Sequence, residues 1–291
     1  MNFLNFMTKV RMYPFGTSLR DKLNMNFSAI LCFSALLLCS PLFAQENWKI
    51  MNELEYHYQR IDYWRSRMNN DSAVSEESLL RSKLLTYTAT APTLKLNFKY
   101  LKYYDGLTVL TSDDKSFRIY SWDDGTKEQH HYINVFQYKN NDKVESAMTM
   151  HGVDAGAQEQ REYKDVYTLK AKDRTYYLAR YIVRKGGGEY SVGLEVFSRD
   201  ANGMNDSSQI IVTNTYGMAV DNIELEVSNI SSGALSHTIY FNKFRKLLYV
   251  PIIWQDGVVS TAYTTYKFKD HYFTEVKEEA KKQKRTAGNK S

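Results

Sequence analysis

The chain has 291 residues, with 38 basic and 33 acidic side chains and a formal net charge of +5. The positive excess lies at the two ends, because residues 45–274 hold 28 basic and 29 acidic side chains. A nucleic-acid-binding protein needs a basic face on its folded body. This balance therefore argues against a nucleic-acid partner.

Residues 27–38, "FSAILCFSALLL", form an apolar run near the N-terminus. It is too short to span a bilayer, which needs about 20 residues. Arg20 and Lys22 precede the run and the small Ala44 follows it, an order typical of a secretory signal peptide. We predict that residues 1–44 are cleaved off near Ala44. The product would be exported to the periplasm or the exterior, without an integral membrane segment.

Both cysteines, Cys32 and Cys39, lie in this predicted signal peptide. The mature chain, residues 45–291, then has no thiol, which excludes disulfides, thiolate catalysis and cysteine-bound zinc. Its length allows one core that buries roughly 70–75% of the unfolded surface. A secreted protein without disulfides fits a bacterial periplasm or exterior.

Residues 45–92 are predicted to form an N-terminal helical segment. "NND" at 69–71 interrupts the pattern, and a second, shorter helix is expected from about Ser75 to before Pro92. In the first helix, apolar side chains recur at three- and four-residue steps, which places them on one face. They are Trp48, Met51, Leu54, Tyr58, Ile61 and Met68.

From Leu94 onward the chain is rich in Tyr, Phe, Val, Ile and Thr, with Asp-Gly, Gly-Gly and Asn-rich turns between alternating runs. This composition is typical of strands. We predict about twelve strands and a last short one at 271–275. The twelve are 107–112, 116–122, 130–139, 143–150, 164–170, 175–184, 189–198, 209–213, 222–228, 235–241, 247–254 and 260–268.

A repeat lies within this β region. "FRIYSWDDG" at 117–125 and "YVPIIWQDG" at 249–257 both end a strand in Trp-x-Asp-Gly, and 175–197 has a similar strand-turn-strand layout. We predict a mainly β fold of three four-stranded antiparallel meanders over 93–275, followed by a basic flexible tail at 276–291. A closed propeller usually needs at least four blades. A propeller-like sheet, a sandwich and an irregular barrel all stay open.

Two aspartates and two histidines come close together in "FRIYSWDDGTKEQHHYINVFQY". Asp124 and Gly125 stand where two alternating runs meet, a strong hairpin signal. His130 and His131 must face opposite sides of the return strand. We interpret the stretch as a turn. In the alternative, Asp124 and one histidine hold a metal or share a proton, but a metal site needs three or four converging ligands.

Recognisable catalytic signatures are absent from the sequence. There is no Gly-x-Ser-x-Gly elbow, and "RKGGGEY" lacks the Lys-Ser/Thr of a phosphate-binding loop. "DANGMNDSS" lacks the acidic ligands of a calcium loop. We therefore predict no cofactor and no metal, and favour a non-catalytic protein.

Aromatic residues make up 14% of the chain, with 23 tyrosines. Tyrosine on an exposed sheet face offers apolar area with a polar tip, which suits a sugar or a protein interface. The alternative is that the rings pack across strands and cover the core. The residues near the repeated turns are the candidate binding site: Tyr120, Trp122, Asp124, Trp254 and Asp256.

The signal ending "FAQ", the stretch "SDDKSFRIYSWDDGT" and the strand "TYYL" carry a resemblance. Over roughly 107–275 the chain resembles uncharacterised secreted β-rich proteins of Gram-negative bacteria. The resemblance implies export and a β architecture, and it implies no activity. Our hypothesis is a secreted non-catalytic module that binds a polysaccharide or an envelope protein through an aromatic surface. The alternative is a hydrolase of envelope or extracellular carbohydrate that uses the turn carboxylates.

Overall fold

A computed structural model describes residues 47–96, 98, 107–123, 132–148, 161–186, 189–205, 208–213, 218–228 and 238–276. The chain divides into two compact units, residues 1–50 and 51–291, and the elements described below belong to the second, apart from residues 47–50 of the first helix. The predicted signal peptide and all of the predicted tail except Val276 lie outside the described residues.

Two α-helices open the described chain, one over residues 47–66 and α2 over Asn70–Thr88. The break predicted around residues 69–71 is present, but α2 begins earlier than expected. The Asn69 side chain accepts a hydrogen bond from the backbone N–H of Ser72 (3.1 Å), which is a typical N-cap. A short 3₁₀ helix, η2 (Ala91–Lys95), follows α2.

The apolar face predicted for the first helix is correct in its central part. Leu54, Tyr58 and Ile61 are buried, whereas Trp48 and Met68 are exposed. Met68 leaves the face because the helix ends at residue 66 and Met68 takes a left-handed φ of 55°. Among the helices that the structure describes, none is long and apolar enough to cross a membrane.

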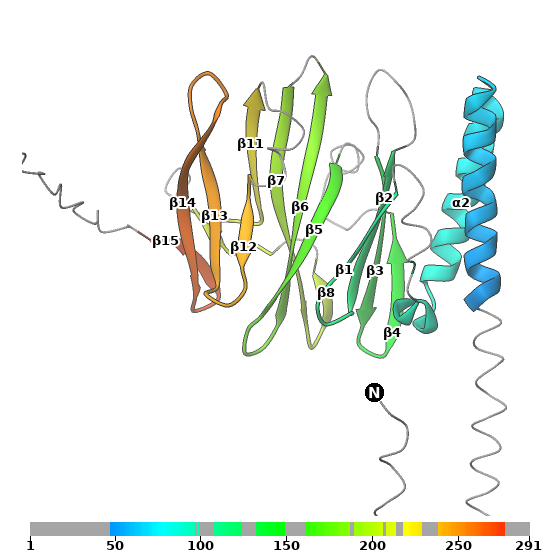
Figure 1. Cartoon of the computed structure of the whole chain (residues 1–291). Coiled ribbons are helices and arrows are strands. Elements are labelled where there is room, and N and C mark those ends of the chain that lie inside the picture. The colour runs from blue at the N-terminus through cyan, green and yellow to red at the C-terminus, as the bar shows by residue number, and fades with distance from the viewer. Residues whose placement is uncertain are drawn as a thin grey trace, which may run out of the picture. The chain divides into compact units, whose positions relative to one another are not determined.

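Fifteen strands in the described residues form three sheets (Figure 1). Sheet 1 is a simple meander in chain order, β1 (Leu107–Thr111), β2 (Phe117–Asp123), β3 (Tyr132–Asn140) and β4 (Lys143–Ala147). Sheet 2 has the order β11-β7-β6-β5, with β8 paired to β7. Its strands are β5 (Arg161–Lys170), β6 (Thr175–Gly186), β7 (Glu189–Asp200), β8 (Gly203–Asn205) and β11 (Asn222–Ser228).

Sheet 3 has the order β10-β9-β15-β14-β13-β12. Its strands are β9 (Ile211–Val212), β10 (Ala219–Val220), β12 (Tyr240–Asn242), β13 (Leu247–Ile253), β14 (Val259–Lys269) and β15 (Tyr272–Glu275). Strand pairs in the three sheets are antiparallel, apart from the parallel pair of β9 and β15. The chain thus enters sheet 3 at β9, returns to sheet 2 for β11 and completes sheet 3 from β12 onward.

Sheet 2 is the middle layer, because both of its faces are buried. Leu178 and Ile182 of β6 join a core shared with sheet 3, whereas Tyr177 and Tyr181 of the same strand join a core shared with sheet 1. Successive side chains of a strand point to opposite faces, so one strand supplies both cores. Figure 1 shows sheet 2 between the other two sheets.

The helical segment packs on sheet 1. The hydroxyls of Thr88, at the end of α2, and Ser146, in β4, are hydrogen-bonded at 2.6 Å. Gln137 of β3 donates from Nε2 to the carbonyl of Thr88 (2.8 Å) and to Oγ1 of Thr93 in η2 (2.6 Å). These bonds fasten the end of α2 and the start of η2 to the sheet.

The prediction of a mainly β fold after one or two helices is confirmed. Every predicted strand overlaps an observed one, and sheet 1 is the first predicted meander. The third meander, β12 to β15, is also continuous, but β9 and β10 extend its sheet. The second meander is β5 to β7 completed by β11. Two short strands were not predicted: β8, which lies in "DANGMNDSS", and β10.

Candidate functional site

Tyr120 and Trp122, predicted to lie at a binding surface, are in the interior, with exposed fractions of 0% and 2%. Both belong to β2, directly before the first Trp-x-Asp-Gly turn. Asp124, His130 and His131 lie outside the described residues. The first copy of the repeat therefore presents no exposed aromatic ring among its described residues.

The Tyr120 hydroxyl is part of a network that holds η2 against sheet 1. It donates to Oε1 of Gln137 (2.8 Å) and accepts from Nη1 of Arg118 (3.2 Å). Arg118 also donates to the carbonyls of Thr93 (3.0 Å) and Leu94 (3.1 Å). Burial raises the pKa of Tyr120 to about 12, against the opposing effect of Arg118. The hydroxyl thus stays protonated, and its role is structural.

Trp254 and Asp256 lie in the turn between β13 and β14, where the second copy of the repeat ends. Trp254 is 59% exposed. Oδ1 of Asp256 accepts a hydrogen bond from the backbone N–H of Val258 (3.1 Å), and Gly257 has a φ of 78°. A left-handed φ favours glycine, so Asp256 and Gly257 form the predicted turn.

We expect Asp256→Ala to lower the free energy of unfolding by about 0.5–1 kcal/mol, because the Val258 N–H loses its acceptor. Asp256→Asn keeps an acceptor oxygen and should lie close to wild type. Urea denaturation of the three proteins measures the difference. Equal stability of the alanine and asparagine variants would contradict this role for the carboxylate.

An exposed aromatic group does exist, on a part of sheet 3 that the sequence reading did not single out. Tyr240 of β12 lies directly opposite Tyr249 of β13, and their rings stack with centroids 4.4 Å apart and an interplanar angle of 10°. Tyr263 of β14 stands edge-on to both, at 5.7 Å from Tyr240 and 6.2 Å from Tyr249. We call Tyr240, Tyr249 and Tyr263 the tyrosine face.

The alternation of the strands places the tyrosine face on the outer side of sheet 3. The neighbouring residues Phe241, Leu248 and Val250 are in the core between sheets 2 and 3, so the tyrosines point the other way. Tyr240 is 38% exposed, and its two partners are half-buried. Partial burial raises the pKa of Tyr240, which keeps its hydroxyl neutral and able to donate.

The tip of the β13–β14 hairpin also exposes aromatic and apolar side chains. Ile252, Trp254 and Val258 are all exposed there. Trp254 follows Tyr249 by five positions, about 16 Å of extended chain at 3.3 Å per residue, and lies just beyond the end of β13.

Ionisable side chains that could hold a metal do not gather in the described part of the chain: it contains no group of three or more His, Cys, Asp or Glu residues suited to that role. Comparisons with protein-family models, with curated proteins and with solved structures found no match. The resemblance to secreted β-rich proteins therefore stays a prediction. The geometry of this chain is therefore the basis for its proposed function.

The alternation of residues along the strands indicates part of the tyrosine face. Tyr249 lies between two core residues of its strand, Leu248 and Val250. What the sequence lacked was the register that sets Tyr240 opposite Tyr249 and Tyr263 opposite Pro251. Three single tyrosines become one surface only through that pairing.

Proposed function

We propose that this protein is an exported, non-catalytic module that binds a polysaccharide along the outer side of sheet 3. The tyrosine face is the observation that supports it, because three rings gather on the side of the sheet turned away from the core. A pyranose ring has an apolar C–H side and a hydroxyl rim. An aromatic ring with a polar tip complements both.

The size of the tyrosine face favours a narrow ligand over a protein partner. A stable protein interface buries about 800 Å² on each side, whereas a whole aromatic side chain offers about 150–250 Å². The three tyrosines are already largely covered by one another and by the sheet. A single extended chain that runs from Tyr249 toward Trp254 needs much less area.

The hydrolase alternative has no comparable support. A glycoside hydrolase needs two carboxylates about 5–9.5 Å apart, on either side of the scissile bond. Of the turn carboxylates in the described residues, Asp123 ends β2 in sheet 1 and Asp256 lies at the tip of a sheet 3 hairpin. Sheet 2 separates these two sheets, so the two carboxylates do not face each other.

Retention of the purified protein on insoluble polysaccharides tests this function. Cellulose, chitin and peptidoglycan are suitable matrices, and wild type should be retained by at least one of them. Tyr249→Ala and Tyr263→Ala should each weaken retention about tenfold, which corresponds to about 1.4 kcal/mol for a central interface residue.

Tyr56→Ala is the matched control, because Tyr56 is an exposed tyrosine of the first helix, at 54%, and is not part of the tyrosine face. It should bind like wild type. The function would be refuted if no matrix retained wild type, or if Tyr56→Ala weakened retention as much as the two sheet variants did. Unchanged thermal unfolding of all variants excludes a folding defect.

A further inference from the structure

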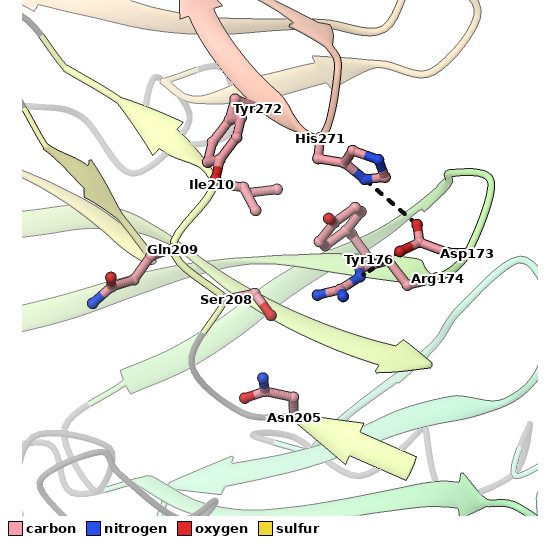
Figure 2. A pocket seen from close by; sticks show the side chains of 9 residues that line it. All are labelled: Asp173, Arg174, Tyr176, Asn205, Ser208, Gln209, Ile210, His271 and Tyr272. Atoms are coloured by element: carbon pink, nitrogen blue, oxygen red, sulfur yellow. Dashed lines mark ion pairs between the residues drawn. The ribbon is translucent and has the colours of Figure 1, made fainter. Parts of the chain in front are cut away.

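A second feature, distinct from the tyrosine face, is a cavity of about 340 Å³ at one end of the core between sheets 2 and 3 (Figure 2). It is surrounded by the β5–β6 turn, the end of β8, the segment 208–210 that crosses from sheet 2 to sheet 3, and the β14–β15 turn. The lining residues are Asp173, Arg174, Tyr176, Asn205, Ser208, Gln209, Ile210, His271 and Tyr272.

Backbone hydrogen bonds hold the cavity walls in place. The Ala171 N–H donates to the Arg174 carbonyl (2.9 Å) and closes the β5–β6 turn. The Ser208 N–H donates to the carbonyl of Val196 (3.2 Å), and the Phe273 N–H donates to that of Ile210 (2.7 Å). The crossing segment is thus fixed to both sheets, as expected of a pre-formed ligand site.

The polar groups of the cavity centre on the Asp173 carboxylate. One oxygen lies 3.4 Å from Nδ1 of His271, and the other lies 3.5 Å from Nε of Arg174. Nη2 of Arg174 is 3.9 Å from Asp200. These separations exceed the 2.7–3.2 Å of a good hydrogen bond. A ligand hydroxyl can therefore insert between the charged groups without breaking a strong bond. Figure 2 shows His271 and Arg174 converging on Asp173 at the rim.

The backbone of the β14–β15 turn also points to a role for the His271 side chain. Asp270 and His271 have φ values of 50° and 72°, the left-handed pair of a two-residue hairpin that usually contains Asn-Gly or Asp-Gly. A side chain at such a φ costs energy that glycine avoids. Histidine at the glycine position places an imidazole beside Asp173 at the expense of turn stability.

Size and charge define the ligand class. The volume is at the lower end of small-molecule sites and equals that of roughly eleven waters, enough for one sugar ring. Two carboxylates, Asp173 and Asp200, face the single guanidinium of Arg174, so the charge balance disfavours an anion. Tyr272 and the buried Tyr176 add rings with hydroxyls, and burial raises the pKa of Tyr176, which keeps its hydroxyl protonated.

We propose that this cavity binds one neutral sugar residue, either a free monosaccharide or the end of a glycan chain. Asp173 and Arg174 would contact the ligand hydroxyls from the β5–β6 turn, and His271 and Tyr272 would contact it from the β14–β15 turn. This site is independent of the proposed polysaccharide surface.

Saturation-transfer NMR of the purified protein tests the proposal. Glucose, galactose, mannose and N-acetylglucosamine are the free-sugar probes, and short oligosaccharides that end in each of them are the chain-end probes. Wild type should transfer saturation to the ring protons of at least one probe. Transfer to a free sugar assigns a monosaccharide, and transfer to oligosaccharides alone assigns a chain end.

The variants Asp173→Asn and His271→Gly should each weaken the affinity for that probe about tenfold, as expected for the loss of a contact to a charged or polar group. His271→Gly should also keep or raise the melting temperature, because glycine relieves the left-handed φ. Asp270→Gly is the matched control: it lies in the same turn and does not line the cavity, so binding should be unchanged.

The proposal is overturned if wild type transfers saturation to none of the probes, or if Asp173→Asn and His271→Gly bind like wild type. It is also overturned if Asp270→Gly loses binding as they do, since that would assign the effect to the turn. Tyr249→Ala should leave this binding intact, so the result is independent of the polysaccharide test.

Discussion

Replacing Arg161 with methionine is expected to lower the free energy of unfolding by about 3–5 kcal/mol, the cost of leaving a buried charge without its partner. Arg161 and Glu195 are 6% and 3% exposed between sheets 1 and 2. Nη1 of Arg161 lies 3.1 Å from Oε2 of Glu195. The Tyr163 hydroxyl donates to the same oxygen at 2.6 Å. The guanidinium also lies over the Tyr181 ring, 4.4 Å from its centroid.

The double variant Arg161→Met/Glu195→Gln should recover most of this loss. Neither residue then carries a charge, and the glutamine oxygen still accepts from Tyr163. Urea denaturation of wild type, both single variants and the double variant completes a double-mutant cycle. A double variant as unstable as the sum of the single variants would contradict an ion pair as the source of the effect.

The loss of stability caused by Arg161→Met should depend on pH. Burial raises the pKa of Glu195 above its ordinary 4.5, while Arg161 and Tyr163 oppose that rise. Because the folded-state pKa is raised, the stabilising contribution of Glu195 is complete below about pH 4.5 and is lost as the pH rises through the folded pKa. Without Arg161 the pKa rises further, so the variant should lose more stability at about pH 8 than at about pH 4.

The second large effect is expected at Gly193 of β7. Its strand neighbour Tyr181 lies across it, and a Cβ at residue 193 would come within 2.2 Å of the Tyr181 ring. The ring crosses the glycine to reach β11, where its hydroxyl is hydrogen-bonded to Asn222 and Glu224, each at 2.9 Å. Gly193→Ala must displace the ring from these bonds and from Arg161, which should cost about 3 kcal/mol.

Removing the Tyr181 ring should abolish the loss of stability caused by Gly193→Ala. In a Tyr181→Val background the space above residue 193 is open, and alanine is the better strand residue by about 0.5–1 kcal/mol. Gly193→Ala should then be neutral or slightly stabilising, as measured by thermal unfolding of the four proteins. A loss of about 3 kcal/mol in both backgrounds would show that the backbone at residue 193, and not the ring, excludes the methyl group.

The positions of the strands could be predicted from the sequence because the alternation of apolar and polar residues is a local property. Strand β11, for example, was expected at 222–228 and is observed as Asn222–Ser228. The Arg161–Glu195 pair could not be predicted. Its two residues are in non-adjacent strands of sheet 2, and many acidic and basic residues alternate along those strands. The cavity could not be predicted either, because its walls come from segments that are distant in sequence.

The repeated Trp-x-Asp-Gly motif separates what the sequence determined from what the tertiary structure decided. The sequence by itself determined the strands and, in the second copy, a turn at Asp256 and Gly257, because turn chemistry depends on neighbouring residues. The tertiary structure decided how exposed Trp122 and Trp254 are: the first is buried and the second is exposed. Alternation predicts which side chains share a face of a strand. It does not predict whether another layer covers that face, because this depends on contacts between distant parts of the chain.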